Sequence, residues 1–371
     1  MRIGIITSLR RECGIGIYTF ELLKYLKKIN EIREIHVFTH TDADIEIKNR
    51  KIKIYKVIDE KTPNYVPKMK KMLERKNLDI IDLEWEHGLY APQYFLGTFL
   101  FPLILSLKDK LFTSFHSLYT FQDFKRALKI SKNFNNFISE VGALYYKLTK
   151  TFLIKNLKVG RVFSIYEYNQ IRKKDKKKFI IVPEGIERTY NQKPINGRYV
   201  NLTIFGFIRL TKDYNLAISA LNLLPKKFRL IIAGKPQKNE LVGYIRALIK
   251  KYRVKDRVIL IPRFLSEREK IKLMEKTHIL LLPYLLISNS GVLMDGIEYM
   301  RPIVSTVLKD DIEMLRIGKY SEHNKESFSE AILNLYNNYE EYINNIKEVQ
   351  KEFLWKNVIW KIMEGFYRVL E

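Results

Sequence analysis

Cysteine is almost absent from this chain, with Cys13 the single example among 371 residues. A disulfide framework is therefore excluded, and one thiol with six scattered histidines provides no cluster of metal ligands. A signal peptide is also lacking, because Met1 and Arg2 lead directly into a short strand-like run. These absences predict a cytoplasmic protein that binds no metal.

Acidic residues are scarce relative to basic ones. Lys and Arg number 66 against 41 for Asp and Glu, which gives a formal net charge of +25. Such a charge favours anionic partners, which include nucleotide phosphates, lipid phosphates and nucleic acid. No dedicated nucleic-acid motif is present, so nucleic acid is not an expected partner. An anionic membrane surface, bound peripherally on the inner face of the cell membrane, remains a candidate partner.

One segment, His87–Leu107, is free of charged residues over about the length of a membrane span. It contains Pro92 and Pro102 together with polar residues, which suits a buried loop and helix better than a transmembrane helix. The hydrophobic content of the whole chain, 46%, is sufficient for packed interiors.

Strand-like apolar runs alternate with amphipathic helical stretches along the chain, as in parallel α/β proteins. In the first half the predicted strands are Arg2–Thr7, Glu34–Thr39, Lys51–Val57, Asp79–Leu83, Leu111–Phe115, Arg161–Ile165 and Phe179–Val182. In the second half they are Val200–Phe205, Arg229–Ala233, Arg257–Ile261, His278–Leu282 and Ile303–Ser305. A polar Pro- and Gly-containing linker, 191–198, separates the two series. We therefore predict an α/β protein of two Rossmann-like, doubly wound domains facing across a cleft.

Polar residues and glycines follow several strands of the first half. Gly14 and Gly16 open a helix after the first strand, where backbone can approach an anion. A third glycine is missing, so the full dinucleotide fingerprint is absent and an ordinary tight turn explains the pair as well. His116 directly follows a strand, where it would either contact a ligand or form ordinary structural hydrogen bonds. Glu86 and His87 follow the preceding strand.

In the second half, Arg209 and Lys212 lie at a strand-to-helix turn that begins with Gly206. Their charges suit a diphosphate, because Arg binds bidentately and Lys acts as a compact cation. Two solvated charges at a helix start are the alternative interpretation. The next two strands end at Gly234 and at the pair Arg263 and Phe264, respectively.

A polar loop of small residues precedes a helix and the strand that starts near Pro302. The loop and first helical residues are Ser288, Asn289, Ser290, Gly291 and Val292. Free backbone N–H groups at such a helix N-terminus can bind a phosphate or sugar oxygen. The helix carries two acidic residues, Asp295 and Glu298, of which Glu298 is expected on a solvated face.

These segments together resemble the family 4 retaining glycosyltransferases, which have the GT-B fold. The resemblance covers nearly the whole chain and rests on three features: the run GIGIYTFELLKYL from Gly14, the motif GFIRLTK ending at Lys212, and the helix that leads to Pro302. It implies an acceptor-side domain at 1–190 and a nucleotide-sugar domain at 199–350. A C-terminal helix at 351–371 would cross back to the first domain.

The resemblance also implies roles for single residues. Arg209 and Lys212 would stabilise the departing diphosphate without a metal, and His116 would lie close to the transferred sugar. Donor contacts would come from Gly14, Gly16, Gly206, Gly234, Arg263, Phe264, Ser288, Asn289, Ser290, Gly291, Val292 and Asp295. Glu86 and His87 would lie on the acceptor side. The implied reaction moves a hexose-type sugar from a UDP- or GDP-sugar to a hydroxyl of a glycan or lipid-linked acceptor, with no cofactor.

One position departs from the family pattern. Ile287 stands where many members have the first of two glutamates, and Asp295 stands at the second, which typically binds the ribose. Either Ser288 or Asn289 replaces the missing carboxylate, or loop N–H groups bind the sugar. Two further functions stay open: another GT-B enzyme such as a nucleotide-sugar epimerase, and an inactive homologue that binds anionic ligands.

Three charged segments have simpler interpretations. Asp42-Ala43-Asp44 mimics a metal-binding DxD motif but is expected in a solvated loop. The basic run Arg172–Lys178 is typical of a solvated turn and could also contact anionic lipid. Phe121–Arg161 combines many aromatics with nine basic and two acidic residues. That composition suits either an interfacial surface or a helix pair with its aromatics packed inward.

Overall fold

The computed structural model describes residues 1–92, 97–132, 134–190 and 198–371. The predicted linker therefore lies outside the described residues, except for Arg198. The chain divides into two compact units. Unit 1 consists of Met1–Lys129, Phe134–Gly185 and Trp355–Glu371, and unit 2 is made mainly of Ile186–Leu354.

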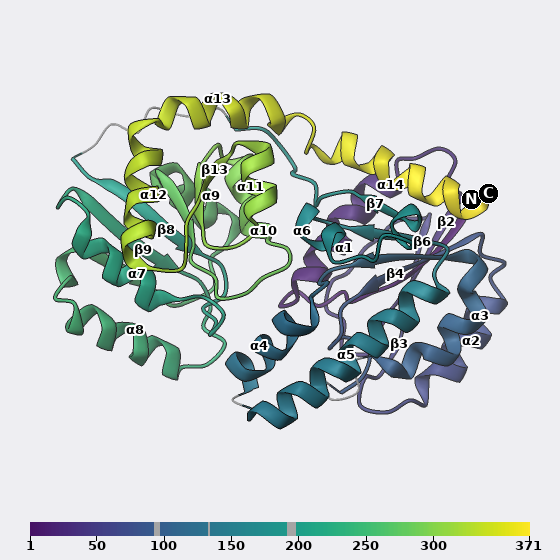
Figure 1. Cartoon of the computed structure of the whole chain (residues 1–371). Coiled ribbons are helices and arrows are strands. Elements are labelled where there is room, and N and C mark those ends of the chain that lie inside the picture. The colour runs from purple at the N-terminus through teal and green to yellow at the C-terminus, as the bar shows by residue number, and fades with distance from the viewer. Residues whose placement is uncertain (93–96, 133, 191–197) are drawn as a thin grey trace. The chain divides into compact units, whose positions relative to one another are not determined.

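Unit 1 contains a seven-stranded parallel sheet in the order β3-β2-β1-β4-β5-β6-β7. Its strands are β1 (Arg2–Ile6), β2 (Glu34–His40), β3 (Ile52–Ile58), β4 (Ile80–Trp85), β5 (Leu111–Phe115), β6 (Val159–Val162) and β7 (Phe179–Ile181). Its helices are α1 (Gly14–Leu26), α2 (Tyr65–Glu74), α3 (Phe101–Leu107), α4 (Phe121–Lys132), α5 (Asn136–Asn156), α6 (Ile165–Asn169) and α14 (Trp355–Leu370) (Figure 1).

Unit 2 contains a six-stranded parallel sheet in the order β10-β9-β8-β11-β12-β13. Its strands are β8 (Val200–Phe205), β9 (Phe228–Ala233), β10 (Val258–Ile261), β11 (Ile279–Leu282), β12 (Ile303–Ser305) and β13 (Gly318–Tyr320). Its helices are α7 (Tyr214–Ala220), α8 (Glu240–Lys251), α9 (Glu267–Lys276), α10 (Gly291–Glu298), α11 (Lys309–Leu315), α12 (Lys325–Asn337) and α13 (Tyr339–Gln350). The predicted pair of Rossmann-like parallel sheets is confirmed.

The central strands β4, β5 and β6 of unit 1 are buried throughout, whereas the edge strand β3 is partly exposed. Helices α1 and α14 build one core, in which Leu22, Trp355 and Phe366 are fully or almost fully buried. Helices α2 and α3 with part of α5 build the other core around Phe115. The last helix of the chain thus completes the core of unit 1.

Three sequence predictions differ from the structure. The sixth strand ends at Val162 rather than Ile165, because the Ser164 side chain caps α6 by accepting from the Glu167 N–H, while the Glu167 carboxylate accepts from the Phe163 N–H. The C-terminal helix expected at 351–371 starts only at Trp355, after a break that separates it from α13. The three-residue strand β13 was missed, since its sequence is too short and polar for a periodic signal.

No helix in the described part of the chain is long and apolar enough to cross a membrane.

Each sheet reverses its strand order at one point, between β1 and β4 in unit 1 and between β8 and β11 in unit 2. Open parallel sheets bind ligands beside the carboxyl ends of the strands at such a reversal. The segments that follow β8 and β11, which include the predicted donor residues Gly206 and Ser288, Asn289, Ser290, Gly291, Val292 and Asp295, therefore meet at this position of unit 2.

Candidate functional site

The loop after β8 holds a buried lysine. Lys212 is only 5% exposed, and its Nζ donates a hydrogen bond of 2.6 Å to the backbone carbonyl of Phe205. Burial, followed by the charge of Arg209, lowers the pKa of Lys212 to about 7. Because the Lys212 backbone also pairs with Tyr284, the loops after β8 and β11 are joined. The ammonium is thus close to losing its proton at neutral pH.

Arg209 differs from Lys212 in its surroundings. Its side chain is exposed, and its guanidinium lies 5.0 Å from the ring centre of Phe207. Its backbone N–H donates to the Tyr214 hydroxyl at 3.2 Å, which fixes the turn before α7. Among the described residues the guanidinium forms no ion pair, so it is accessible to an anion.

Two predicted glycines allow close contacts at this turn. Gly206 has a φ of +89°, and a Cβ built there would lie 3.5 Å from both Lys212 Nζ and Val292 Cγ2. A Cβ on Gly234 would lie 2.1 Å from the carbonyl oxygen of Gly206, which excludes any other residue without rearrangement. The structure thus brings Gly206, Lys212 and Val292 together beside the start of α10.

The first turn of α10 has no side-chain cap, although Ser290 occupies the N-cap position. Ser290 Oγ is buried without a hydrogen-bond partner among the described residues. Burial raises the pKa of the neighbouring Tyr284 hydroxyl to about 12. Its interaction with Ser290 lowers that pKa, but by less than burial raises it. Asn289 Oδ1 accepts from the Ser290 N–H at 2.7 Å, and Ser288 is buried. An anion could therefore cap this helix.

Asp295 is ion-paired rather than free, because its Oδ1 lies 2.6 Å from Lys270 Nζ. Burial lowers the pKa of the Lys270 ammonium. The charge of the adjacent Asp295 carboxylate outweighs this effect, so the pKa is raised above its ordinary value. The predicted solvated position of Glu298 is wrong. Burial raises the pKa of Glu298 to about 7, since the side chain lies within this cluster beside Lys270 and Asp295.

The loop after β10 is exposed. Phe264 is 59% exposed, and Arg263 forms an ion pair of 2.5 Å with Glu269 in the first turn of α9. Ser266 and Glu269 form a capping box there, which fixes the loop against the helix. The aromatic ring is therefore presented to solvent on a rigid turn.

In unit 1, the loop before α1 is tightly packed. A Cβ on Gly16 would lie 2.3 Å from the carbonyl oxygen of Arg10, whereas Gly14 has open space around its Cα. Arg10 pairs with Asp42 at 2.7 Å, and the N–H of Arg11 donates to Asp44 at 2.8 Å. The acidic residues of the DxD-like segment thus hold the glycine loop in place.

His116 sits above a buried acidic pair. Its Nε2 lies 2.6 Å from Glu84 Oε2, and burial lowers the pKa of the imidazole to about 4. Burial raises the pKa of both Asp82 and Glu84, and the charge of Glu84 raises that of Asp82 further. The fully buried Arg161 supplies the compensating positive charge and is held by the carbonyls of Val182 and Pro183, at 2.9 Å each.

Glu86 and His87 form a second pair after the same strand. The Glu86 carboxylate lies 2.5 Å from His87 Nδ1 and accepts a hydrogen bond of 2.6 Å from Ser117. Burial lowers the pKa of the His87 imidazole. The adjacent Glu86 carboxylate outweighs this effect, so the pKa is raised above its ordinary value. The His87 ring also packs edge-on against Phe124 at 5.1 Å.

Comparison with known proteins shows which solved structures have a similar architecture. Protein-family models and curated sequences give no match to the chain. Among solved structures it is similar to a sucrose-phosphate synthase from Thermosynechococcus elongatus, with 14% identity, 98% of each chain covered and a TM-score of 0.71. A glycosyltransferase from Rickettsia africae has 13% identity, covers 100% of this chain and 98% of its own, and has a TM-score of 0.70.

HepE of Anabaena, determined with UDP and glucose, has 10% identity over 98% of each chain and a TM-score of 0.67. The chain has the GT-B fold. At these identities the similarity establishes the fold, and the chemistry of the site has to be argued from its residues.

Sequence reasoning missed several buried charges of this GT-B chain, namely Asp82, Glu84, Arg161 and Lys270. A signal for the acidic ones exists, because Asp82 and Glu84 occupy alternate positions along one face of β4, which is buried throughout. Charged residues that repeat with a period of two in a buried strand require partners.

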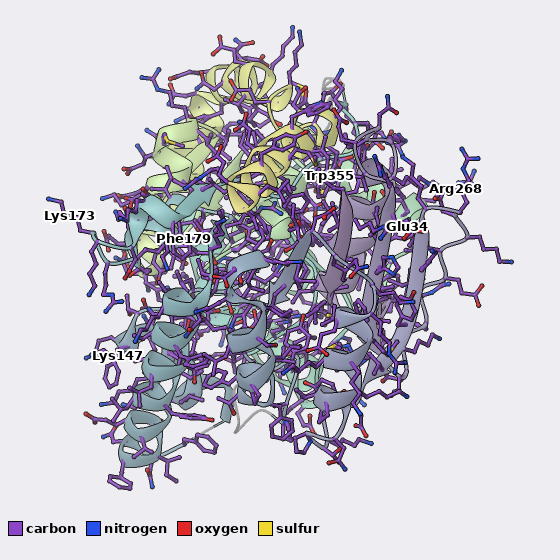
Figure 2. All side chains as sticks on the ribbon, turned by 90° about the vertical axis from the view of Figure 1, so that its right-hand side faces the viewer. Glu34, Lys147, Lys173, Phe179, Arg268 and Trp355 are labelled. Atoms are coloured by element: carbon purple, nitrogen blue, oxygen red, sulfur yellow. The ribbon has the colours of Figure 1, made fainter. Side chains whose placement is uncertain are left out.

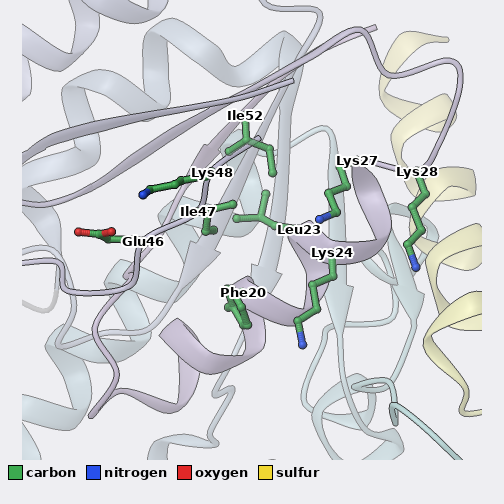
Figure 3. A pocket seen from close by; sticks show the side chains of 9 residues that line it. All are labelled: Phe20, Leu23, Lys24, Lys27, Lys28, Glu46, Ile47, Lys48 and Ile52. Carbon is green, nitrogen blue, oxygen red and sulfur yellow. The ribbon is translucent and has the colours of Figure 1, made fainter. Parts of the chain in front are cut away.

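A separate cavity of about 380 Å³ lies in unit 1 between α1 and the segment before β3 (Figure 3). Its lining combines apolar and basic side chains: Phe20, Leu23, Lys24, Lys27, Lys28, Glu46, Ile47, Lys48 and Ile52. None of the predicted site residues lines it, so it is distinct from the loops at the strand-order reversals.

Proposed function

We propose that the chain is a retaining glycosyltransferase that moves a hexose-type sugar from a nucleoside-diphosphate sugar to a hydroxyl of a glycan or lipid-linked acceptor. The observation that carries this proposal is the buried Lys212 beside the uncapped start of α10. A buried ammonium whose described partners are one carbonyl oxygen and, at 5.7 Å, the ring of Tyr284 is unfavourable unless a ligand supplies negative charge. HepE, which was determined with UDP and glucose, supports a UDP-type donor.

In this proposal the diphosphate lies between Arg209, Lys212 and the first turn of α10. As the glycosidic bond breaks, negative charge grows on the departing diphosphate, and the two cations with the backbone N–H groups stabilise it. They supply the positive charge that a metal ion provides in other phosphate chemistry, so the transfer would need no metal. Lys212 would take up a proton when the donor binds.

The remaining residues receive supporting roles. His116, which is neutral at pH 7 and oriented by Glu84, would hydrogen-bond to the transferred sugar. The Asp295 carboxylate, oriented by Lys270, would accept from the ribose, and the exposed Phe264 would stack on the base. With Ile287 at the family's glutamate position and Asn289 engaged locally, backbone N–H groups of the loop would contact the sugar.

Further proposed contacts come from Gly14, Gly16, Arg263 and the acceptor-side pair Glu86 and His87. We place the reaction at the cytoplasmic face of a membrane, since a lipid-linked acceptor would be presented there.

A two-step experiment tests the proposed function. UDP-, GDP- and ADP-sugars are first screened for a rise in melting temperature, because a ligand held by the native state stabilises it. Release of nucleoside diphosphate from the best donor is then measured for wild type, Lys212→Met and the control Lys238→Met, an exposed lysine of the same unit. We expect turnover to fall by orders of magnitude in Lys212→Met alone.

A normal rate in Lys212→Met would refute the role of the lysine in departure of the diphosphate. Formation of a new nucleotide sugar without acceptor would instead identify an epimerase. Donor stabilisation with no product from any acceptor would identify an inactive binding homologue.

A further inference from the structure

Helix α5 presents large apolar side chains to solvent. Phe137, Val141, Leu144 and Leu148, with the adjacent Ile138, are between 46 and 76% exposed. The first four recur at spacings of four, three and four residues, which places them on one side of the helix. Within the described residues they form a continuous apolar stripe on the surface of unit 1.

This stripe is not the packing face of the helix, since α5 already has one on its opposite side. The buried residues of that side are Ser139, Ala143, Tyr146, Thr149, Leu153 and Ile154. Helix α4 packs closely against α5: the rings of Phe124 and Tyr146 stack at 4.0 Å, and a Cβ on Gly142 would touch the side chain of Leu128. Since the inner side is already packed, the bulky apolar residues of the outer side form a surface typical of one that something else covers.

The charges around the stripe are positive. The single acidic residue of α5, Glu140, is paired with Lys125 of α4 at 2.6 Å. The exposed basic residues of α5 are Lys147 and Lys155, whereas Lys150 is half-buried and donates to the carbonyl of Tyr119 at 2.8 Å. Figure 2 shows Lys147 on the outer side of α5 and Lys173 on the same side of unit 1.

The apolar stripe and the positive charges near it together indicate which partner covers this surface of α5. A second copy paired through the stripe would bring the exposed lysines of two α5 helices together, which like-charge repulsion opposes. A bilayer containing anionic lipids satisfies both features, because apolar side chains enter the headgroup–acyl boundary while cations contact the lipid phosphates. Free phosphate would satisfy the cations but would leave the stripe exposed.

We propose that α5 lies on an anionic membrane surface, with Phe137, Leu144 and Leu148 inserted and the basic residues of α5 and of the Arg172–Lys178 run on the phosphates. The membrane partner deepens the proposed function and rests on it, because a lipid-linked acceptor requires the enzyme at the bilayer. Docking itself involves none of the residues assigned to donor binding.

Vesicle flotation of the full chain tests the proposal. Vesicles of phosphatidylcholine alone are compared with vesicles that also contain phosphatidylglycerol, for wild type and for the triple variant Phe137→Ser/Leu144→Ser/Leu148→Ser. The control is Trp360→Ser/Leu370→Ser, which removes two exposed apolar side chains of similar exposure from α14 of the same unit. We expect the triple variant to lose at least tenfold of its partitioning to anionic vesicles and the control to lose little. Neutral vesicles should bind wild type weakly.

Equal flotation of wild type and triple variant, or equal binding to neutral and anionic vesicles, would overturn the proposal. So would a wild-type dimer in analytical ultracentrifugation that the triple variant dissociates, since a second copy would then cover the stripe. Donor-induced stabilisation is measured on the same samples and should be unchanged in the triple variant. Flotation without any glycosyl transfer would refute the proposed function and leave the docking surface intact.

Discussion

Proton uptake on donor binding provides a direct test of the role of Lys212. With a pKa of about 7, roughly one lysine in ten carries its proton at pH 8 in the free protein. A diphosphate placed next to Nζ favours the charged form strongly, so binding of UDP-glucose at pH 8 should take up about 0.9 proton per site. The diphosphate of the sugar nucleotide does not itself titrate in this range.

Isothermal titration calorimetry in two buffers of different ionisation enthalpy measures this uptake, because the buffer supplies the proton. The uptake should be absent in Lys212→Met, which keeps the length of the side chain, and unchanged in Lys238→Met. A binding enthalpy of wild type that is independent of the buffer would show that Lys212 does not meet the diphosphate.

The same pKa implies a cost in stability. Moving the pKa of Lys212 from 10.5 to about 7 corresponds to roughly 5 kcal/mol at 1.36 kcal/mol per pH unit. The variant also loses the hydrogen bond from Lys212 to the Phe205 carbonyl, which costs about 1–2 kcal/mol of stability. Lys212→Met should therefore stabilise unit 2 by roughly 3 kcal/mol at pH 6. Because the folded-state pKa is depressed, this gain is full below pH 7 and disappears as the pH approaches 10.5. If the melting temperature of Lys212→Met at pH 6 is not higher than that of wild type, the burial of the Lys212 ammonium is contradicted.

Three further substitutions test other parts of the site. Glu84→Gln should lower kcat by roughly tenfold with little change in donor KM, since His116 loses a charge-assisted hydrogen bond; a change confined to KM would contradict this. Gly234→Ala should cost roughly 3 kcal/mol or more in urea unfolding, because its Cβ would meet the Gly206 carbonyl; an unchanged midpoint would refute it. Glu298→Gln should raise the melting temperature at pH 8, above the folded-state pKa of about 7, and have no effect near pH 4.

The fold was predictable because buried parallel strands consist mainly of consecutive apolar residues, which can be recognised in the sequence. The strands β5 and β8 have the predicted bounds, since Lys110 and His116 flank the first and Gly206 ends the second. The end of β6 was not predictable from hydrophobicity, because Phe163 and Ile165 are apolar while the hydrogen bonds of Ser164 turn the backbone into α6. Local capping chemistry, rather than the apolar pattern, decided that boundary.

The site was predictable only where a charge stands at a strand end next to a glycine, as with Lys212 and Gly206. The partners of the other site residues come from distant segments. Asp295 is paired with Lys270 of the preceding helix, and Glu84 joins Asp82 to His116 across two strands. Such pairs depend on the register of the sheet and on helix packing, which a single sequence does not encode at one position.

These pairs also explain why Lys212 stands out. In the described part of the chain, the partly buried cations Arg10 and Lys270 have carboxylate partners, and Arg161 lies beside the buried acidic pair Asp82 and Glu84. Arg301 and Lys212 are buried without a carboxylate partner among the described residues; Lys212 has one carbonyl oxygen and, at 5.7 Å, the ring of Tyr284. Of these two, only Lys212 lies beside a second cation, Arg209, and the uncapped start of α10, so its missing negative charge is best supplied by a ligand that binds and leaves, as a sugar-nucleotide diphosphate does.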